Sequence, residues 1–472
     1  MRRKHLVIGS IVVLIASAIW SIGLIAPMHY RLPDAGFDPA DYSGPVYMVN
    51  GLKIGEVSSD SAILWTRLTR NPEMDPETDW GRLVSGVPGE VRASYWPVDD
   101  ENLRVETPWS EVDADKDFTR QLHLANLTPA TDYFVLVEGR PLDDVENVSQ
   151  LEGKFRTAPG GEQVAQVRFS VLTGQAYHRR DDDENGHKIF KVMESMDLDF
   201  LVHTGDIIYY DKPEPYATTL PVARFKWNRM FALPYQRSFF NQTSSYFMKD
   251  DHDTLKNDSW PGQWFGDLTW AQGLALFREQ VPMGEHTYRT FRWGKNLQIW
   301  LVEGRDFRSE NMMADGPDKS IWGDAQKNWL FESVKASDAT YRILISPTPI
   351  VGPDRGDKYD NHANPAFATE GAEIRSFVAS QENMFIICGD RHWQYVSEDP
   401  ETGVIEFSAG PTTDRHANGF SEKDESSMHR YLKVKGGFLA VSVSPDAEEP
   451  EITFTHHAVD GSIYNQETFS RF

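Results

Sequence analysis

Residues 200–209 read Phe-Leu-Val-His-Thr-Gly-Asp-Ile-Ile-Tyr, a short apolar run that ends in a glycine and an aspartate. The run has the length and composition of a buried strand, and Gly205 lets the backbone turn sharply directly after it. Open α/β sheets bind their ligands at the carboxyl ends of their strands. The stretch therefore predicts an α/β domain with Asp206 and Tyr209 at its functional edge.

Two further motifs follow predicted strands in the same way: Asp250-Asp-His-Asp253, and Gly389-Asp-Arg-His392 after an apolar run. Taken alone, a Gly-Asp pair is usually a turn, an acidic run a solvated loop, and a lone histidine a packed one. Carboxylate, phenolate and imidazole groups are the ligands that hard cations take in proteins. Because all three motifs occur together after apolar strands, the sequence predicts a metal site that includes Asp251, Asp390 and His392.

The chain around these motifs alternates strands with helices, which is the pattern of an α/β domain. Pro159-Gly160-Gly161 marks its start, so we expect this catalytic domain over residues 161–472. The alternating tail from Gly437 to Thr455 predicts antiparallel strands, and hence a mixed sheet. The predicted strands are Val167–Leu172, Phe200–His203, Leu297–Val302, Tyr341–Ile345 and Met384–Cys388, and the predicted helices include Lys188–Met196 and the region of Gln326–Phe331.

Residues 46–160 contain short β-rich runs separated by turn-forming residues, the pattern of an all-β sandwich. The late runs resemble a fibronectin type III-like module, with Tyr133 as its corner tyrosine and Trp65 as a core aromatic. The runs are Ala62–Arg67, Val91–Trp96, Arg120–Leu124, Tyr133–Val137 and Lys154–Ala158.

The first 30 residues have the composition of a signal anchor or signal peptide. Arg2, Arg3 and Lys4 precede an apolar run from Leu6 to Ala26, long enough to cross a bilayer as a helix. Residues 34–45 then read as a linker rich in proline and glycine. We expect the rest of the chain to lie outside the cytoplasm, either anchored to the membrane by this helix or secreted, for instance into a periplasm.

Composition excludes several classes of protein. The chain has 71 acidic and 47 basic residues and a formal charge of -24, which repels polyanions, so we expect no nucleic-acid partner. The single cysteine, Cys388, excludes an internal disulfide and a cysteine-rich zinc site, and it reads as a buried strand residue. No protein partner is predicted.

The stretch from Pro213 to Gln236 is rich in arginine and aromatic residues, among them Arg224, Trp227 and Arg229. It either lines a substrate pocket or forms a core-facing helix with a basic outer face.

The combination of motifs resembles the alkaline phosphatase D-like (PhoD-like) branch of the calcineurin-type metallophosphoesterases. The resemblance covers roughly residues 46–455, and its motifs are specific in combination and weak singly. They are Ser61–Leu68, Gly205–Tyr209, Asp250–Asp253 with Asn257, Arg305–Arg308, Gln326–Leu330 and Gly389–His392.

The resemblance implies a fold of two mixed β-sheets sandwiched by helices, with two metal ions, iron and calcium, and manganese or zinc as alternatives. Metal-activated hydroxide would attack the phosphorus of a phosphate ester. It assigns Asp206 as the bridging ligand, Tyr209 as a phenolate ligand that favours ferric iron, and Asp251, Asp390 and His392 as the other ligands. It further assigns His252 as general acid or charge stabiliser, and Asn257 and Arg305 as contacts of the phosphate oxygens. Monoester, diester and phospholipid substrates all stay open.

One position departs from the family pattern. Relatives carry a ligating Cys or Asp after the first strand, where this chain has Gly174, which offers no side chain. Gln175, His178 or the run Asp181–Asp183 would have to substitute, although such an acidic run is more often a solvated loop.

Two other functions remain open on the sequence. A purple-acid-phosphatase-like enzyme shares the Gly-Asp-x-x-Tyr pattern, but it carries an Asn-His pair and a Gly-His-x-His loop where this chain has Asp251-His252 and Gly389–His392. A non-catalytic surface protein that binds a ligand without turnover would explain Gly174. Retention of His252, which has no metal-binding role in the family pattern, argues against it.

Overall fold

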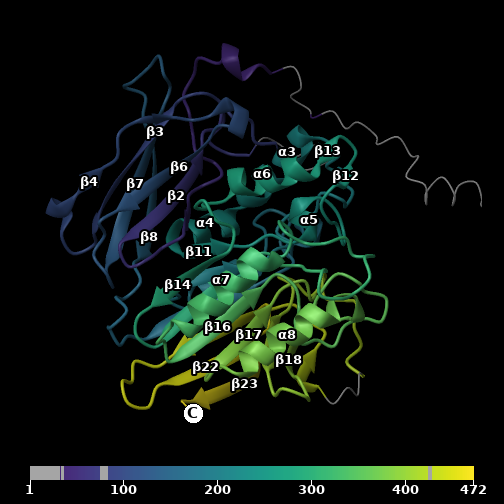
Figure 1. Cartoon of the computed structure of the whole chain (residues 1–472). Helices are drawn as coiled ribbons and strands as arrows, with labels where there is room; N and C mark the ends of the chain where they lie inside the picture. Colours follow the sequence, from purple (N-terminus) through teal and green to yellow (C-terminus); the bar gives the residue numbers. More distant parts are fainter. Residues whose placement is uncertain (1–31, 33–36, 75–82, 424–427, 472) are drawn as a thin grey trace, which may run out of the picture.

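The structure, a computed structural model, describes residues 32, 37–74, 83–423 and 428–471 (Figure 1). The predicted signal segment, residues 1–30, lies outside them. Among the described residues, no helix has both the length and the apolar character needed to span a membrane.

A nine-stranded sheet carries the first two predicted motifs. Its central strands β9 (Val167–Leu172), β10 (Phe200–His203) and β11 (Ser244–Phe247) run parallel to one another. On one side of them lie antiparallel strands from the chain's C-terminal end, which makes the sheet mixed, as predicted. These are β21 (Phe438–Val443), β22 (Glu451–His457) and β23 (Ile463–Ser470).

A seven-stranded sheet carries the third motif and is also mixed. Strands β15, β16, β17 and β19 are parallel, and strands at both edges are antiparallel to their neighbours. In spatial order the strands are β14 (Arg289–Trp293), β15 (Leu297–Leu301), β16 (Tyr341–Ser346), β17 (Met384–Cys388), β19 (Ile405–Ala409), β18 (Gln394–Glu398) and β20 (His429–Lys433).

The two sheets pack face to face, and helices cover their outer faces. Alternate residues of β16 point to opposite sides: Ile343 lies in the core between the sheets, and Leu344 lies in the core under the helices. Figure 1 shows α7 and α8 in front of the seven-stranded sheet. The covering helices are α2 (Lys188–Glu194), α3 (Leu220–Phe231), α4 (Pro234–Gln242) and α6 (Trp270–Gln280) over the larger sheet, and α7 (Gly323–Lys335) and α8 (Ala368–Ala379) over the smaller. This confirms the predicted architecture of two mixed sheets between helices.

The N-terminal region forms two antiparallel sheets around a core of its own. Tyr133 accepts a hydrogen bond on its hydroxyl from the backbone N–H of Thr128, at 2.9 Å, the contact expected of a corner tyrosine. One sheet contains β1 (Lys53–Gly55), β2 (Ser61–Arg67) and β6 (Thr119–Ala125). The other contains β3 (Glu90–Pro97), β7 (Asp132–Arg140) and β8 (Ser149–Arg156), with β4 (Val105–Glu106) and β5 (Ser110–Glu111) at its edge.

The N-terminal region is joined to the rest of the chain by strand pairing, which the sequence did not predict. Strand β1 pairs in parallel with β11, in the register Ile54 to Ser244 and Gly55 to Ser245. The sheet of β1, β2 and β6 is therefore the continuation of the nine-stranded sheet. Although the chain divides into two regions by sequence, their backbones form one continuous hydrogen-bonded layer.

Trp65 is fully buried, as predicted, but outside the core of the N-terminal sandwich. Its indole Nε1 donates to the carbonyl of Glu279 in α6, at 2.7 Å. The Nζ of Lys53 lies over its ring, 3.2 Å from the centroid. Because side chains alternate along β2, Leu64 faces the sandwich core while Trp65 faces the helices of the other region.

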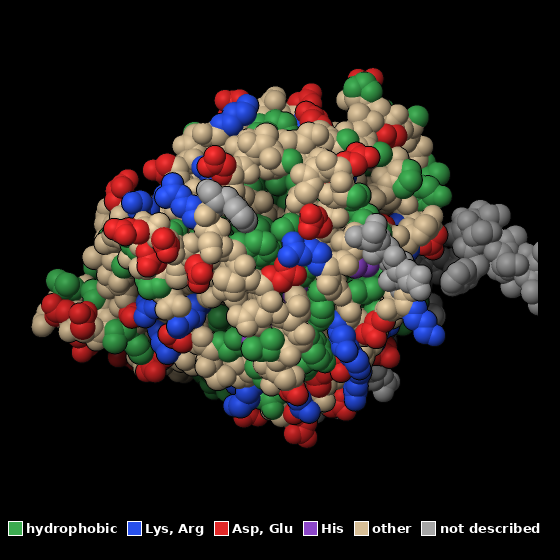
Figure 2. Space-filling view, turned by 90° about the horizontal axis from the view of Figure 1, so that it is seen from below, with side chains coloured by type: hydrophobic (Ala, Val, Ile, Leu, Met, Phe, Trp, Pro, Cys, Tyr) green, Lys and Arg blue, Asp and Glu red, His purple; other side chains and the backbone are tan. Residues whose placement is uncertain are grey.

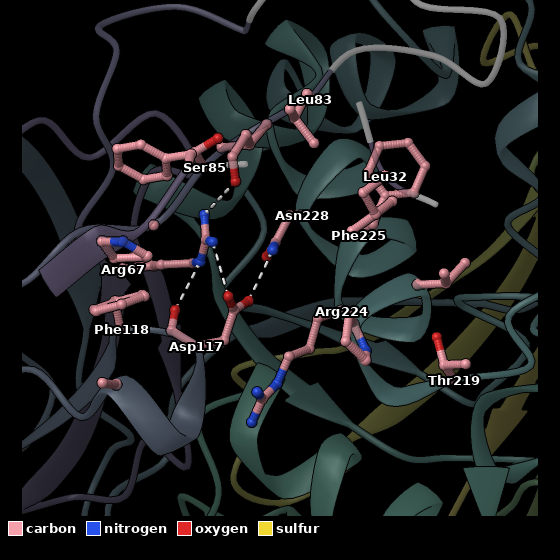
Figure 3. Close-up of a pocket in the computed structure, with 17 residues that line it drawn as sticks. Leu32, Arg67, Leu83, Ser85, Asp117, Phe118, Thr219, Arg224, Phe225 and Asn228 are labelled. Carbon is pink, nitrogen blue, oxygen red and sulfur yellow. Dashed lines mark hydrogen bonds and ion pairs between the residues drawn. The ribbon is translucent and has the colours of Figure 1, made fainter. Parts of the chain in front are cut away.

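A cavity of about 540 Å³ lies between the two regions (Figure 3). Arg67 and Asp117 project into it from the N-terminal region and Asn228 from α3. Asp117 accepts hydrogen bonds from Arg67 Nη2 at 2.9 Å and from Asn228 Nδ2 at 2.7 Å. One carboxylate thus ties the two regions together at the wall of the cavity.

The helices α3 and α4 face the core, as the second interpretation of the arginine-rich stretch predicted, but α3 has no exposed basic face, and its Arg224 lines the cavity between the two regions. Trp227 and Arg229 are buried, and Arg224 pairs with Glu279 at 2.6 Å.

On the face seen in Figure 2, acidic side chains are scattered among basic and uncharged ones rather than gathered in one region.

Candidate metal centre

The predicted motifs meet at the carboxyl ends of the parallel strands of both sheets. Asp206 follows β10, Asp251 begins the short helix α5 (Asp251–Thr254) after β11, and Asp390 follows β17. Asp206 and Asp390 adopt left-handed backbone conformations, with φ of 56° and 61°, that L-residues rarely occupy. Gly205 is required beside them, since a Cβ there would lie 2.7 Å from the backbone nitrogen of Asp250.

Three potential ligands from the first and third motifs are in direct contact. The Tyr209 hydroxyl lies 2.9 Å from Asp206 Oδ2 and 3.2 Å from His392 Nε2, and His392 Nε2 lies 3.4 Å from Asp206 Oδ2. Asp206 is 2% exposed, and its Oδ1 has no hydrogen-bond partner among the described residues. A buried carboxylate oxygen without a donor, beside a phenol and an imidazole, fits a metal ion.

The second motif brings Asp251 and His252 to the same place. Ligand atoms of Asp206, Asp251 and His252 all lie within 4.8 Å of one another. The carboxylate of Asp251 is held by two backbone N–H donors, that of His252 at 2.8 Å and that of Asp258 at 2.6 Å. Asp251 is thereby oriented before any cation binds.

His252 is held by an aspartate that the sequence analysis did not single out. Its Nδ1 lies 2.6 Å from Asp211 Oδ1, and Asp211 Oδ2 accepts the backbone N–H of Asn257 at 3.0 Å. Burial lowers the pKa of His252, but Asp211, Asp251 and Asp206 outweigh burial and raise that pKa to about 10. The ring of His252 is therefore protonated near neutral pH, which is the form that a general acid needs. Asn257 itself is exposed, beside this pair.

Two other groups in the centre, Tyr209 and Asp390, need a nearby positive charge to ionise readily. Burial and the neighbouring Asp206 raise the pKa of the Tyr209 phenol well above its usual value. Burial likewise raises the pKa of Asp390, whose Oδ2 accepts a hydrogen bond from Arg391 Nη1 at 2.6 Å. A bound cation would favour the charged forms of both groups.

Arg305 differs from its predicted role as a contact of the phosphate. It is fully buried, and all three of its guanidinium nitrogens donate to protein oxygens. Nε and Nη2 bind Asp250 Oδ1 at 2.8 and 2.5 Å, and Nη1 binds the carbonyl of Ser259 at 3.1 Å. The guanidinium therefore anchors the loop that carries Asp251 and His252 from behind.

Gly174 sits against the predicted ligand His392. A Cβ at position 174 would lie 3.1 Å from His392 Cδ2 and 3.2 Å from its Nε2, and the backbone φ of Gly174 is +62°. A side chain at this position would have to displace the imidazole. The present position of His392 therefore requires glycine at position 174.

The suggested substitutes for a side chain at position 174 lie elsewhere. Gln175 is buried with its Oε1 3.2 Å from His203 Nε2, and His178 is exposed. The acidic run forms turns, since Asp181 accepts the backbone N–H of Lys188 and Asp182 those of Glu184 and Asn185. The sulfur of Cys388 is buried in β17 beside the Tyr395 hydroxyl, as predicted for a strand residue.

His416 is a further imidazole in the centre that the sequence analysis missed. Its ring centroid lies 4.0 Å from that of His392, and its Nδ1 lies 3.0 Å from the Gly174 carbonyl. It follows β19 without a neighbouring Gly-Asp pair, so only its place after a parallel strand and a proline could have drawn attention to it.

Comparisons with known proteins show which family and which fold the chain shares. A family model described as PhoD-like phosphatase matches residues 169–446, more than half of the chain, and one described as PhoD-like phosphatase, N-terminal domain, matches residues 36–159. The chain is 24% identical to alkaline phosphatase D of Bacillus subtilis (strain 168) over 468 residues, covering 84% of this chain and 75% of that protein.

Two solved structures share the fold over most of its length. A structure of PhoD superposes with a TM-score of 0.72 at 18% identity and covers 91% of each chain. The purple acid phosphatase PPD1 from yellow lupin (Lupinus luteus) seeds superposes with a TM-score of 0.64 at 12% identity, over 89% of this chain and 74% of that one.

Proposed function

The chain belongs to the PhoD-like phosphatase family and is a metal-dependent phosphoric ester hydrolase, and we propose that Asp206 is the central ligand of its metal centre. Tyr209 and His392 would complete the site of one ion, and Asp251 and Asp390 that of a second. The observation that carries this proposal is the contact of Asp206, Tyr209 and His392 around a buried Asp206 oxygen without a donor.

We propose iron with calcium as the two metals. A phenolate such as that of Tyr209 favours ferric iron, and a site made of aspartate oxygens suits calcium. When bound, the ions supply Lewis acidity, which activates a water molecule and neutralises charge on the phosphoryl oxygens.

The protein's own residues hold the substrate and move one proton. His252 would donate the proton from its ring to the oxygen of the leaving alcohol, while Asp211 keeps the ring in place. The exposed amide of Asn257 is suited to contact a phosphate oxygen. Arg305 acts indirectly, as a positioning residue for the loop of Asp251 and His252.

We propose that the substrate is an organic phosphate ester, hydrolysed as by an alkaline phosphatase or phosphodiesterase, outside the cytoplasm. The composition of residues 1–30 supports the location, and the likeness to alkaline phosphatase D supports the activity. The corner contact of Tyr133 supports a fibronectin type III-like N-terminal module.

The purple-acid-phosphatase-like alternative shares the fold but not the motifs, since Asp251-His252 and Gly389–His392 differ from that pattern. The non-catalytic alternative is disfavoured by the Asp211 contact, because a protein that only binds has no need of an oriented imidazolium.

The test is metal reconstitution of the full chain. We would remove its metals and measure hydrolysis of p-nitrophenyl phosphate and bis-p-nitrophenyl phosphate after adding iron, calcium, manganese or zinc. His252→Ala is expected to lower turnover by about 10²–10⁴-fold, the usual contribution of a general acid. His123→Ala, the loss of an exposed histidine in the N-terminal region, is the matched control. Absence of turnover with every metal would disprove the assignment of the centre.

A further inference from the structure

A second group of carboxylates adjoins the metal centre and shares Asp251 with it. Ligand atoms of Asp251, Asp258 and Asp360 lie within 4.8 Å of one another. Asp258 follows α5, and Asp360 comes from the segment between β16 and α8. The two sheets therefore each contribute to this group, which we call the Asp360 cluster.

Three carboxylates at such distances repel one another unless a cation lies among them. Asp251 and Asp360 are 2% and 0% exposed, so water screens them little. The Oδ2 of Asp360 is buried and accepts no hydrogen bond from any described residue. An unpartnered, buried carboxylate oxygen indicates that the cluster is built around a positive charge.

Lys358 supplies such a charge. Its Nζ forms an ion pair with Asp258 Oδ1 and lies 3.9 Å from Asp360 Oδ2, and its side chain is 10% exposed. The segment that carries it is fixed, because the Asp360 carbonyl accepts a hydrogen bond from Arg308 Nη2 at 2.7 Å. A lysine ammonium is compact and has three donors, which suits a site bounded by several carboxylates.

We propose that Lys358 is a tethered cation which occupies the Asp360 cluster in place of a divalent metal ion. The neighbouring centre differs, since Asp206 Oδ1 has no such partner among the described residues. The ammonium also steadies the centre: it pairs with Asp258, whose backbone N–H donates to Asp251 Oδ2 at 2.6 Å. The role of Asp251 as a ligand rests on the proposed function; the occupancy of the Asp360 cluster does not.

The test counts calcium ions bound by the full chain, by isothermal titration calorimetry and by elemental analysis after gel filtration. Lys358→Met removes the charge and keeps much of the side-chain length. We expect this variant to bind one more calcium ion per chain than the unchanged protein. The double variant Lys358→Met with Asp360→Asn should lose the additional ion.

Lys256→Met is the matched control, because Lys256 lies near the same loop but its Nζ donates to the Trp264 carbonyl, at 3.5 Å, and forms no ion pair with a described carboxylate. It should leave the calcium count unchanged. Lys358→Arg keeps the charge and should also leave it unchanged. Circular dichroism confirms that each variant is folded.

Equal calcium counts for folded Lys358→Met and the unchanged protein would overturn the proposal. The single variant Asp360→Asn gives a second test. If it binds one calcium ion fewer than the unchanged protein, the cluster already holds a metal and the proposal is wrong. This measurement decides the question if Lys358→Met does not fold. Asp206→Asn separates this proposal from the proposed function. The variant should lose activity, yet adding Lys358→Met to it should still increase the number of bound calcium ions by one.

Discussion

Gly174 stands where the resemblance implies a metal-ligating side chain, and its surroundings predict the effect of replacing it. In Gly174→Ala the new methyl group would press on His392, 3.1 Å away. The left-handed backbone alone should cost about 1–2 kcal/mol of unfolding free energy. Displacing His392, a proposed metal ligand, should lower metal affinity by roughly 10–100-fold, the range seen when groups that orient ligands are lost.

Gly403→Ala separates these two effects. Its φ is +74°, and a Cβ there would meet no described atom within 4 Å. This control should lose stability but keep its metals and its activity. If both variants keep full metal affinity in calorimetric titrations, then Gly174 does not fix the position of His392.

Arg305 offers a second prediction, because its buried pair with Asp250 gives it a structural role. Arg305→Met would leave Asp250 buried without its partner, which should cost about 3–5 kcal/mol of unfolding free energy in urea denaturation. Arg168→Met, at a surface pair with Asp197, should cost no more than about 1 kcal/mol. A raised KM with unchanged stability in Arg305→Met would instead favour direct contact with the substrate.

At the scale of residues, strand-end motifs led to Asp206, Tyr209, Asp251, His252 and His392, which the fold brings together. They did not lead to Asp211, Lys358 or His416. The roles of these residues follow from contacts across the fold, and their sequence neighbourhood gives at most a weak signal, such as the position of His416 after a parallel strand and a proline.

At the scale of elements, apolar strands were predicted nearly to their ends; β9, β10 and β17 have the predicted bounds. A strand before Asp250 was expected from the motif that follows it, but the bounds of β11 were not predicted, because its sequence, Ser-Ser-Tyr-Phe, begins with two polar residues that are nevertheless buried in the middle of a sheet. The pairing of β1 with β11 escaped as well, since periodicity within a segment carries no information about which distant segment lies beside it.

That pairing predicts the effect of a change at Gly55. A Cβ there would lie 2.6 Å from Pro282 Cγ and 2.7 Å from the carbonyl of Ser245 in β11. Gly55→Ala should therefore force the strands apart and cost about 1–3 kcal/mol, the usual effect of overpacking. Gly161→Ala, which meets no described atom within 4 Å, is the control.

Differential scanning calorimetry would measure this effect. Because one sheet runs through both regions, we expect a single transition that shifts as a whole in Gly55→Ala. Two separate transitions, of which only one moves, would mean that the regions unfold independently.

At the scale of the whole molecule, buried histidines predict how stability depends on pH. His187 and His456 are fully buried, and burial lowers the pKa of each to about 3. Between this value and the unfolded pKa near 6.5, only the unfolded chain binds the proton. The contribution of these histidines to the free energy of unfolding should therefore be fully present above about pH 6.5. It should fall on acidification by roughly 1.4 kcal/mol per pH unit for each histidine.

Urea unfolding at about pH 7.5 and about pH 5 measures this dependence. His187→Gln should be less stable than the unchanged protein at the higher pH, because its contacts with Gln236 and Ala176 are disturbed, yet it should lose less stability on acidification. His123→Gln, at an exposed position, should leave the difference unchanged. An equal loss in all three proteins would assign the acid sensitivity to other groups.

The continuous sheet also bears on how the polypeptide emerges during biosynthesis. Strand β1 leaves the ribosome long before β11, the strand that pairs with Ile54 and Gly55. Until β11 arrives, the nascent N-terminal sandwich presents a bare strand edge to its surroundings. A neighbouring nascent chain offers the same edge, so high expression should favour strand exchange between copies, and a chaperone that shields β1 should raise the yield of correctly folded protein.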